Sequence, residues 1–398
     1  MDNPAPSTLK QKDDALPKRI VFMIPHPPAV DFARKFFVPE LKAAGFEVYL
    51  WNIGPLMDLD LSVETNVEGM HYTRITSLSG LRANISQVDA STTVFVPQIT
   101  RSGRSFSVYF ILGLAKVKTA FFGRGYLPFI SQPRKDGRFF LNRLRQARNF
   151  GLLLRFVWEG VLSRLLPVVK VYDLAFTAGR IAERLHANDA ATLAPIHHFD
   201  IDQMRSDTAP AEVQDRYAVF LDDYLPFHPD FNIGNIGHIE AAPYYKALNA
   251  YFSWAEQTMG LRVIIAAHPK SQYASNPFGG REIIFGKTQR LVRDATLVFA
   301  HGSTAISFAV MYEKPLCLLV SEAIRTVHFP EYNQMLKTVE LLGCPLQDIE
   351  HDRAPEALAA SVAHDKYREF YREFLSYTDD PRTSAEIVVA GIAALSAR

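Results

Sequence analysis

Residues 19–51 read RIVFMIPHPPAVDFARKFFVPELKAAGFEVYLW, and their pattern sets the expected architecture. Residues 20–24 form an apolar run that ends in a Pro-rich loop, which is typical of a buried strand. Residues 31–44 carry apolar side chains at helical spacing and stop at Gly45, and residues 46–51 form a second apolar run. The stretch is therefore one strand–helix–strand unit, which predicts a parallel sheet with a right-handed crossover.

The same pattern returns along both halves of the chain. Further strands are predicted at residues 93–97, 120–122 and 174–177, and then at 217–221, 262–267, 282–285, 296–300 and 315–320. Helices are predicted in the second half at residues 243–259, 288–293 and 304–312. The expected fold class is α/β, with two Rossmann-like domains facing a cleft and a C-terminal helical tail.

The predicted boundaries follow shifts in composition. We expect a disordered lead-in over residues 1–17, an N-terminal Rossmann-like domain over 18–186, a linker over 187–213, a C-terminal Rossmann-like domain over 214–345, and a helical tail over 346–398. His197, His198, Asp200 and Asp202 fall in that linker, where we interpret them as solvated polar residues and not as metal ligands.

Composition favours a cytoplasmic enzyme. The chain has 398 residues, 48% of them hydrophobic, and a net charge of +1, so nothing global points to nucleic acid as a partner. Its two cysteines, Cys317 and Cys344, argue against a disulfide framework, and no signal peptide is visible. The apolar stretch 151–169 is interrupted by charged residues, which makes it a poor spanning helix.

An Arg-rich helical region, residues 138–170, leaves two interpretations open. It could place its arginines and apolar side chains against anionic lipid, which would make the protein peripheral at the inner face of a membrane. It could equally be a core helix with a solvated basic face.

Three polar clusters follow three predicted strands of the second half. They are Asp222-Asp223, His268-Pro269-Lys270 and His301-Gly302-Ser303-Thr304. Ligands of open parallel sheets bind beyond the carboxyl ends of the strands, so we expect the three clusters to face one crevice.

Each cluster suits part of a transfer reaction. The Gly302–Thr304 segment before a helix offers backbone N–H groups and hydroxyls to a phosphate, and His268 can hydrogen-bond or protonate a leaving phosphate. Lys270 and Lys287 would add positive charge. Asp222 or Asp223 would act as a base on an acceptor hydroxyl or attack an anomeric carbon. The alternatives are ordinary: a helix cap, a loop histidine and an ion-paired carboxylate.

Two residues of the first half are candidates for the acceptor side. His26 and Arg124 each follow a predicted strand of the N-terminal domain, so both are expected near the cleft. No group of residues in the sequence has metal-ligand spacing, so no metal is expected.

The acidic pair, the His268-Pro269 dipeptide and the Ser303-Thr304 dipeptide occur in the order of the motifs of bacterial GT-B sialyltransferases and polysialyltransferases, which this sequence therefore resembles. Residues 267–270, 286–287 and 300–304 also resemble bacterial surface-carbohydrate biosynthesis proteins. The resemblance covers about residues 217–320, and the first half shares only the architecture. In the family a Gly usually follows the acidic pair, whereas Tyr224 stands here.

The resemblance implies a metal-independent glycosyltransferase without a cofactor. Its donor would be a CMP-activated nonulosonic or ulosonic acid, such as sialic acid or Kdo, and its acceptor a glycan or glycolipid precursor of capsule or lipopolysaccharide. The acidic residue would act on the acceptor, while His268, Ser303 and Thr304 would hold the CMP phosphate. A base implies inversion at the anomeric carbon and a nucleophile implies retention.

Two alternatives stay open. The same scaffold could use another donor, such as a CDP-polyol or a UDP-sugar, or it could be a catalytically silent binding protein of polysaccharide assembly.

Overall fold

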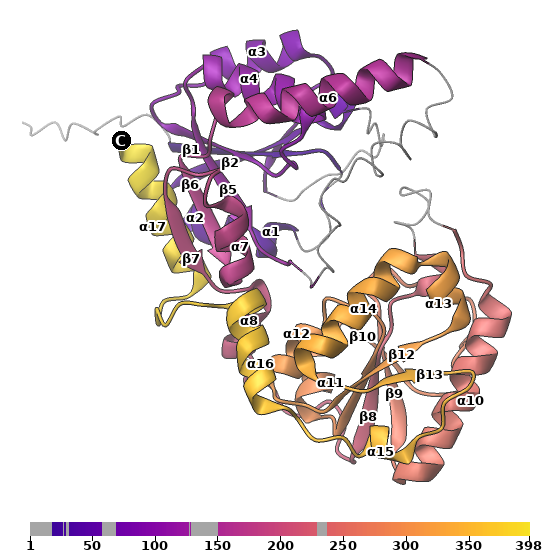
Figure 1. Cartoon of the computed structure of the whole chain (residues 1–398). Coiled ribbons are helices and arrows are strands. Elements are labelled where there is room, and N and C mark those ends of the chain that lie inside the picture. The colour runs from indigo at the N-terminus through magenta and orange to yellow at the C-terminus, as the bar shows by residue number, and fades with distance from the viewer. Residues whose placement is uncertain are drawn as a thin grey trace, which may run out of the picture.

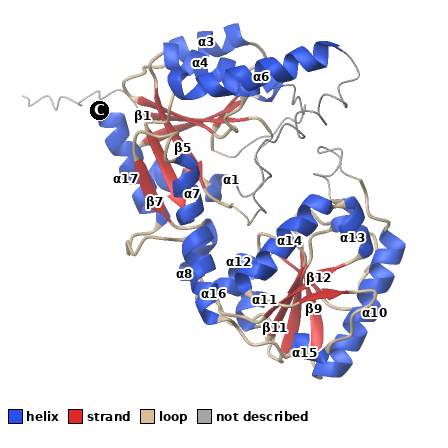
Figure 2. Ribbon diagram, viewed as in Figure 1, coloured by secondary structure: helices blue, strands red, loops and turns tan. Residues whose placement is uncertain are grey.

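The structure is a computed structural model that describes residues 18–26, 28, 32–57, 69–126, 128, 150–228 and 237–398. The predicted lead-in and residues 138–149 of the Arg-rich region lie outside the described residues. Figure 1 shows two lobes, each built around its own sheet, with the helices on both faces of the strands. Figure 2 shows the same view coloured by secondary structure.

The first lobe contains a seven-stranded parallel sheet of order β3-β2-β1-β4-β5-β6-β7. The strands are β1 (Lys18–Ile24), β2 (Phe46–Asn52), β3 (His71–Arg74), β4 (Thr93–Pro97), β5 (Lys118–Gly123), β6 (Leu174–Ala178) and β7 (Leu193–Ile196). Its helices include α1 (Phe32–Lys35), α2 (Val38–Ala43), α3 (Leu78–Ser86), α4 (Phe106–Leu114), α6 (Phe150–Val169) and α7 (Gly179–His186). The strand order reverses between β1 and β4, which is where such sheets open a crevice.

The second lobe contains a six-stranded parallel sheet of order β10-β9-β8-β11-β12-β13. The strands are β8 (Tyr217–Leu221), β9 (Arg262–Ala267), β10 (Ile283–Phe285), β11 (Leu297–Ala300), β12 (Leu316–Val320) and β13 (Leu346–Asp348). Its helices include α10 (Ala241–Met259), α11 (Thr288–Asp294), α12 (Ile306–Met311), α13 (Glu322–Val327) and α14 (Phe329–Leu342). Here the order reverses between β8 and β11, the strands that precede two of the predicted polar clusters.

Burial on both faces explains the continuous apolar runs of the central strands. Every residue of β8 from Tyr217 to Phe220 is fully buried, as is every residue of β1 from Ile20 to Met23. Parallel strands covered by helices on both faces are apolar at nearly every position. Each large apolar side chain buried in this way contributes roughly 1.5–3 kcal/mol to the stability of the fold.

The helix predicted over residues 31–44 is in fact two short helices. Phe37 lies between α1 and α2 in the left-handed conformation, with φ of 55°, and Pro39 stands at the start of α2. Proline donates no backbone hydrogen bond and its ring clashes with the carbonyl four residues earlier, so a continuous helix cannot run through Pro39, whereas proline is tolerated in the first turn of α2.

The predicted linker and tail both contribute to the sheets. Residues 187–213 include β7, which pairs with β6, and helix α8 (Phe199–Ser206). Residues 346–348 form β13, which pairs with β12. Both strands are too short for their periodicity to stand out from their polar surroundings.

The C-terminal segment joins the two lobes. α15 (Pro355–Leu358), α16 (His364–Phe370) and the π-helical turn Tyr371–Leu375 belong to the second lobe, where Phe370 and Phe374 enter the core. α17 (Ser384–Ala397) then packs against the first sheet, with Val388 and Ile392 fully buried (Figure 1). The predicted tail is thus part of both cores.

Three of the four polar residues predicted to be solvated in the linker, His197, His198 and Asp200, are buried at this junction, and Asp202 is half-buried. His197 is 1% exposed, bonded through Nδ1 to Ser376 at 2.8 Å, and Asp200 accepts the Ser307 hydroxyl at 2.5 Å. The solvated interpretation was wrong because the tail folds back over these residues. They hold the two lobes together.

Among the described residues, no helix has the length and apolarity needed to cross a bilayer. Contact of residues 138–170 with a membrane surface stays a prediction.

Candidate functional site

A pocket of about 450 Å³ opens at the carboxyl edge of the second sheet. It is lined by Asp223, Leu225, His228, His268, His301, Gly302, Ser303, Thr304, Ile324, His328, Glu331 and Met335. The three clusters that follow β8, β9 and β11 therefore meet in one place, at the point where the strand order reverses. Pro269, Lys270 and Lys287 do not line this pocket. Lys287 instead pairs with Glu212 at 3.4 Å.

Asp222 faces away from the pocket and organises the loop. Its carboxylate accepts the Tyr273 hydroxyl, the backbone N–H of Tyr224 at 3.0 Å and that of His268 at 3.4 Å. Burial raises the pKa of Asp222, while these donors act in the opposite direction. The residue therefore ties the end of β8 to the end of β9.

Asp223 lines the pocket and is the carboxyl group suited to proton transfer. Burial, and then the charge of the neighbouring Asp222, raise the pKa of Asp223 to about 7. Hydrogen bonds from the Ser303 hydroxyl and the Gly302 N–H lower this pKa, but by less. A carboxyl group with a pKa near 7 can accept a proton efficiently at neutral pH.

Tyr224 shapes the turn that follows the two aspartates. Its backbone lies in the left-handed region, with φ of 54° and ψ of 32°. A non-glycine residue there costs of order 1–3 kcal/mol, and glycine costs little. A glycine would adopt this turn geometry readily, as in the family that the sequence resembles. Here the residue is Tyr224, whose hydroxyl donates a hydrogen bond to Gln272 O at 3.0 Å.

His268 presents a hydrogen-bond donor to the pocket. Its Nδ1 accepts the backbone N–H of Lys270 at 3.1 Å, which in the neutral ring places the proton on Nε2. The ring packs edge-on against His228, with centroids 4.8 Å apart. The turn fixed by Pro269 thus orients an N–H donor along the pocket wall.

His301 supports the site from beneath. Its Nδ1 bonds to Leu319 O at 2.5 Å and its Nε2 to the Tyr244 hydroxyl at 2.8 Å. Burial lowers the pKa of His301 to about 4, so the ring is neutral. Both ring nitrogens are used inside the protein, which indicates a positioning role and not direct binding.

Residues 302–304 form a loop and not a helix start. α12 begins at Ile306, two residues later than predicted, and the Ser303 hydroxyl accepts the N–H of Ala305 at 3.3 Å. Gln334 of α14 holds the Gly302 carbonyl at 3.1 Å. The hydroxyls of Ser303 and Thr304 remain at the pocket wall.

Three polar pocket residues were not among the predicted site residues: His228, His328 and Glu331. His328 precedes α14 and bonds to Gly237 O at 2.9 Å, and Glu331 lies in the first turn of α14. The Glu331 Oε2 atom is buried and accepts no hydrogen bond from the described residues. The signal was the segment His328-Phe329-Pro330-Glu331, a proline-marked helix start behind β12.

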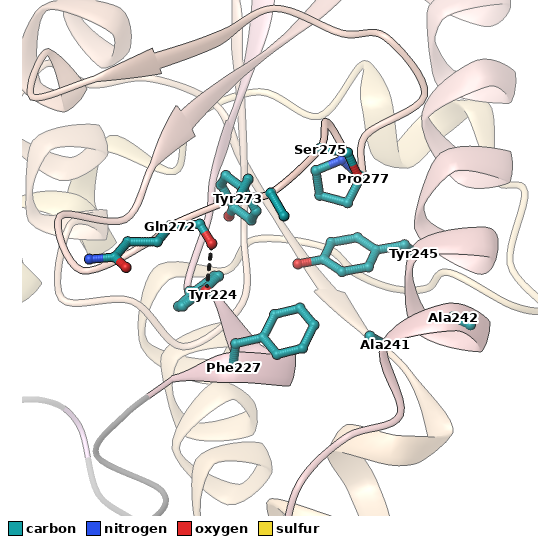
Figure 3. Close-up of a pocket in the computed structure, with 10 residues that line it drawn as sticks. Tyr224, Phe227, Ala241, Ala242, Tyr245, Gln272, Tyr273, Ser275 and Pro277 are labelled. Carbon is teal, nitrogen blue, oxygen red and sulfur yellow. Dashed lines mark hydrogen bonds between the residues drawn. The ribbon is translucent and has the colours of Figure 1, made fainter.

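A second pocket of about 500 Å³ lies on the other side of the loop after β8 (Figure 3). Aromatic side chains dominate it: Tyr224, Phe227, Tyr245 and Tyr273. Figure 3 shows the Tyr224 hydroxyl reaching the Gln272 carbonyl across this pocket. These rings support the turn that holds Asp222 and Asp223.

The two predicted acceptor-side residues of the first lobe, Arg124 and His26, lie in different surroundings. The Arg124 guanidinium stacks within 4.9–5.9 Å of the rings of Phe36, Phe37, Phe122 and Phe199 and lines a pocket of about 490 Å³. His26 is exposed and lines none of the pockets described above.

The described residues include one group with metal-ligand geometry, Asp348, Glu350 and His351 after β13. Asp348 is ion-paired with Arg325, and none of the three residues lines the pocket with Asp223. Independence from metal stays a prediction.

The sequence matches no protein-family model and no curated protein. Solved structures do match over nearly the whole chain. CalG4, the calicheamicin glycosyltransferase, is 12% identical with a TM-score of 0.53, covering 96% of this chain and 99% of its own. The glycotransferase of kitacinnamycin is 13% identical with a TM-score of 0.50, covering 96% and 95%.

These matches confirm the predicted α/β fold, two Rossmann-like lobes of the GT-B type. Neither supports the sialyltransferase type in particular.

Proposed function

We propose that this protein is a glycosyltransferase that binds a nucleotide-activated sugar in the pocket lined by Asp223, His268 and Ser303. One observation carries the proposal. A carboxyl group whose pKa is near 7 lies in one pocket with uncharged hydrogen-bond donors suited to a phosphate, in a fold that known glycosyltransferases share. Fold alone does not give function, so the pocket bears the argument.

The donor would be held by hydrogen bonds. No Lys or Arg is among the described residues that line the pocket. The Nε2–H of His268 and the Thr304 hydroxyl would bind the phosphate, while the Ser303 hydroxyl donates to Asp223. Glu331 would accept hydrogen bonds from the two ribose hydroxyls. A buried carboxylate oxygen that accepts no bond from the described residues suits such a diol.

The acidic residue would act on the acceptor. Asp223 takes the proton of the acceptor hydroxyl while the acceptor oxygen bonds to the anomeric carbon. The bond from that carbon to the phosphate oxygen breaks, and its electron pair leaves with the phosphate, which His268 stabilises. In this form the reaction inverts the anomeric carbon. Should Asp223 attack that carbon itself, a covalent intermediate forms and configuration is retained.

The identity of the nucleotide separates the remaining donor classes. The sequence motifs point to a CMP-linked sugar acid. The fold matches do not favour that class, so UDP-sugars and CDP-polyols stand beside it. Thermal-shift titrations with CMP, CDP and UDP should identify one nucleotide that stabilises the protein, because only a bound ligand raises the melting temperature by mass action.

Hydrolysis or transfer from the matching donor then tests catalysis. If no nucleotide stabilises the protein and no donor is consumed, the proposal fails and the catalytically silent binding protein becomes the better description.

A further inference from the structure

The first lobe contains a pocket of about 490 Å³ that the proposed donor site does not use. It lies beyond the end of β4, between β5 and α7, and its polar lining residues are Gln98, Thr100, Arg101, Arg124, Tyr126, His186 and Asp189. The rest of its wall is largely aromatic, including Phe121 and Tyr172, which stack with centroids 4.8 Å apart.

Arg101 is fixed in this pocket with much of its hydrogen-bonding capacity unused. Its side chain is 8% exposed, and its Nε lies 3.3 Å from an Asp189 carboxylate oxygen. The guanidinium stacks on Tyr109 and Tyr172, at 5.0 and 5.3 Å from the ring centroids. Its Nη1 and Nη2 atoms are buried and have no acceptor among the described residues. The four N–H groups on Nη1 and Nη2 of Arg101 therefore have no hydrogen-bond acceptor in the part of the chain that the structure describes.

Two more unpartnered donors lie in the same pocket. The Tyr126 hydroxyl lies 2.6 Å from His186 Nε2, and burial raises the pKa of Tyr126 to about 12 and lowers that of His186. The Asp189 carboxylate 3.9 Å from Nδ1 favours the tautomer with its proton on Nδ1, in which Tyr126 donates to Nε2. Neither His186 Nδ1 nor the Gln98 side-chain nitrogen has a hydrogen-bond partner among the described residues.

The pocket is linked to the donor site through shared walls. Tyr126 and Gly125 also border a small gap between the lobes, whose opposite side includes Thr304 and Ser307. Thr304 in turn lines the pocket with Asp223. Tyr126 of the first-lobe pocket and Thr304 of the donor pocket therefore line the same small gap.

We propose that this pocket binds an anionic group of the acceptor, a carboxylate or a phosphate, with the Nη1 and Nη2 atoms of Arg101 as its main contacts. The Gln98 amide nitrogen and His186 Nδ1 add to these donors, and the Asp189 carboxylate, which also lines the pocket, lies against the guanidinium at Nε, so the unused groups suit an anion that accepts hydrogen bonds. Asp189 holds the guanidinium by its Nε side and leaves the Nη side for the ligand. The assignment of this group to an acceptor rests on the proposed function, whereas the anion site itself does not.

Direct binding tests the site without any donor. Phenyl phosphate and benzoate are titrated into the full chain at constant ionic strength, with binding followed by ligand-observed NMR. We expect at least one probe to bind, and the tighter of the two identifies the anion as phosphate or carboxylate.

Substitutions locate the binding. Arg101→Gln should weaken the tighter probe about 10- to 100-fold, the usual effect of losing hydrogen bonds from a charged group. Arg101→Lys should give an intermediate loss of probe affinity, because lysine keeps the positive charge but lacks the planar guanidinium with its paired N–H donors. The matched control Arg104→Gln removes an exposed arginine three residues away and should bind like the parent. His268→Ala should also bind like the parent, which separates this site from the phosphate contacts of the second lobe.

Nucleotide-induced stabilisation should persist in Arg101→Gln, which shows that the variant is folded. Failure of both probes to bind the parent, or equal binding by parent and Arg101→Gln, would overturn the proposal and leave Arg101 as a packing residue over two tyrosines. If the parent protein binds a probe but transfers no sugar, that result would count against the proposed function alone.

Discussion

Replacing Asp223 by Asn tests the proposed base and the structure around it at once. Asn keeps the shape of the side chain and an oxygen for the Ser303 and Gly302 donors, but it cannot take a proton at neutral pH. We expect turnover to fall on the order of 100-fold or more, the scale of removing a general base, while the nucleotide still binds. In the parent, turnover should rise with pH and level off above about 7, because only the deprotonated carboxylate acts as a base.

The same substitution should stabilise the fold. The pKa of Asp223 is about 7 against an ordinary 3.8, a difference of about three units, so its ionisation costs the folded state at most about 4 kcal/mol. Because the folded-state pKa is the higher one, the parent loses no stability below about pH 4, loses it progressively as pH rises to about 7, and loses no more above that. The melting temperature of Asp223→Asn should therefore exceed that of the parent at pH 8 and match it near pH 4.

Asp222→Asn is the matched control for this prediction. Asp222 faces away from the pocket, so its variant should lose much less turnover than Asp223→Asn. A larger loss in the Asp222 variant would refute the assignment, and near-parental turnover in both variants would remove the acidic pair from the mechanism. Mass spectrometry of enzyme incubated with donor alone distinguishes the two chemistries, since a nucleophilic Asp223 would carry a sugar adduct and a base would not.

Three further expectations follow from the donor pocket. His268→Ala should weaken binding of the preferred nucleotide about 10-fold or more, whereas Lys287→Ala, which removes a side chain outside the pocket, should change it little; calorimetric titration measures both, and parental affinity in His268→Ala would contradict its role. Glu331→Gln should weaken the nucleotide more than the matching 2′,3′-dideoxynucleotide, because only the former offers the ribose diol; equal losses would remove Glu331 from ribose recognition. Treatment with EDTA should leave transfer unchanged, and an activity loss that divalent ions restore would overturn the metal-independent mechanism.

The fold was predictable from sequence where strands are long and buried on both faces. β4, β8 and β9 occupy the predicted residues, because burial on both faces makes all but the first residue of β4 and β9, and every residue of β8, apolar. β7 and β13 were missed because they are short and read as linker and tail. Only tertiary pairing with β6 and β12 makes them strands.

The site was predictable in part for a related reason. Strand ends can be read from sequence, so Asp223, His268 and Ser303 were found, and parallel topology brings them together. The division of labour between Asp222 and Asp223 was not readable, because it depends on which way each side chain points across one strained turn at Tyr224. Arg101 follows a correctly predicted strand, but its unused donors become visible only when Tyr109, Tyr172 and Asp189 surround it.

The return of α17 to the first sheet has a consequence for how the chain matures. The core of the first lobe is assembled from residues near both ends of the sequence, since Val388 and Ile392 belong to the same hydrophobic cluster as Ile20 and Phe22. During synthesis, residues 18–196 leave the ribosome long before α17 exists, so the first lobe must wait with part of its apolar surface uncovered while the second lobe, a nearly continuous segment, can close on itself. We therefore expect the first lobe to complete its core only once α17 has been synthesised.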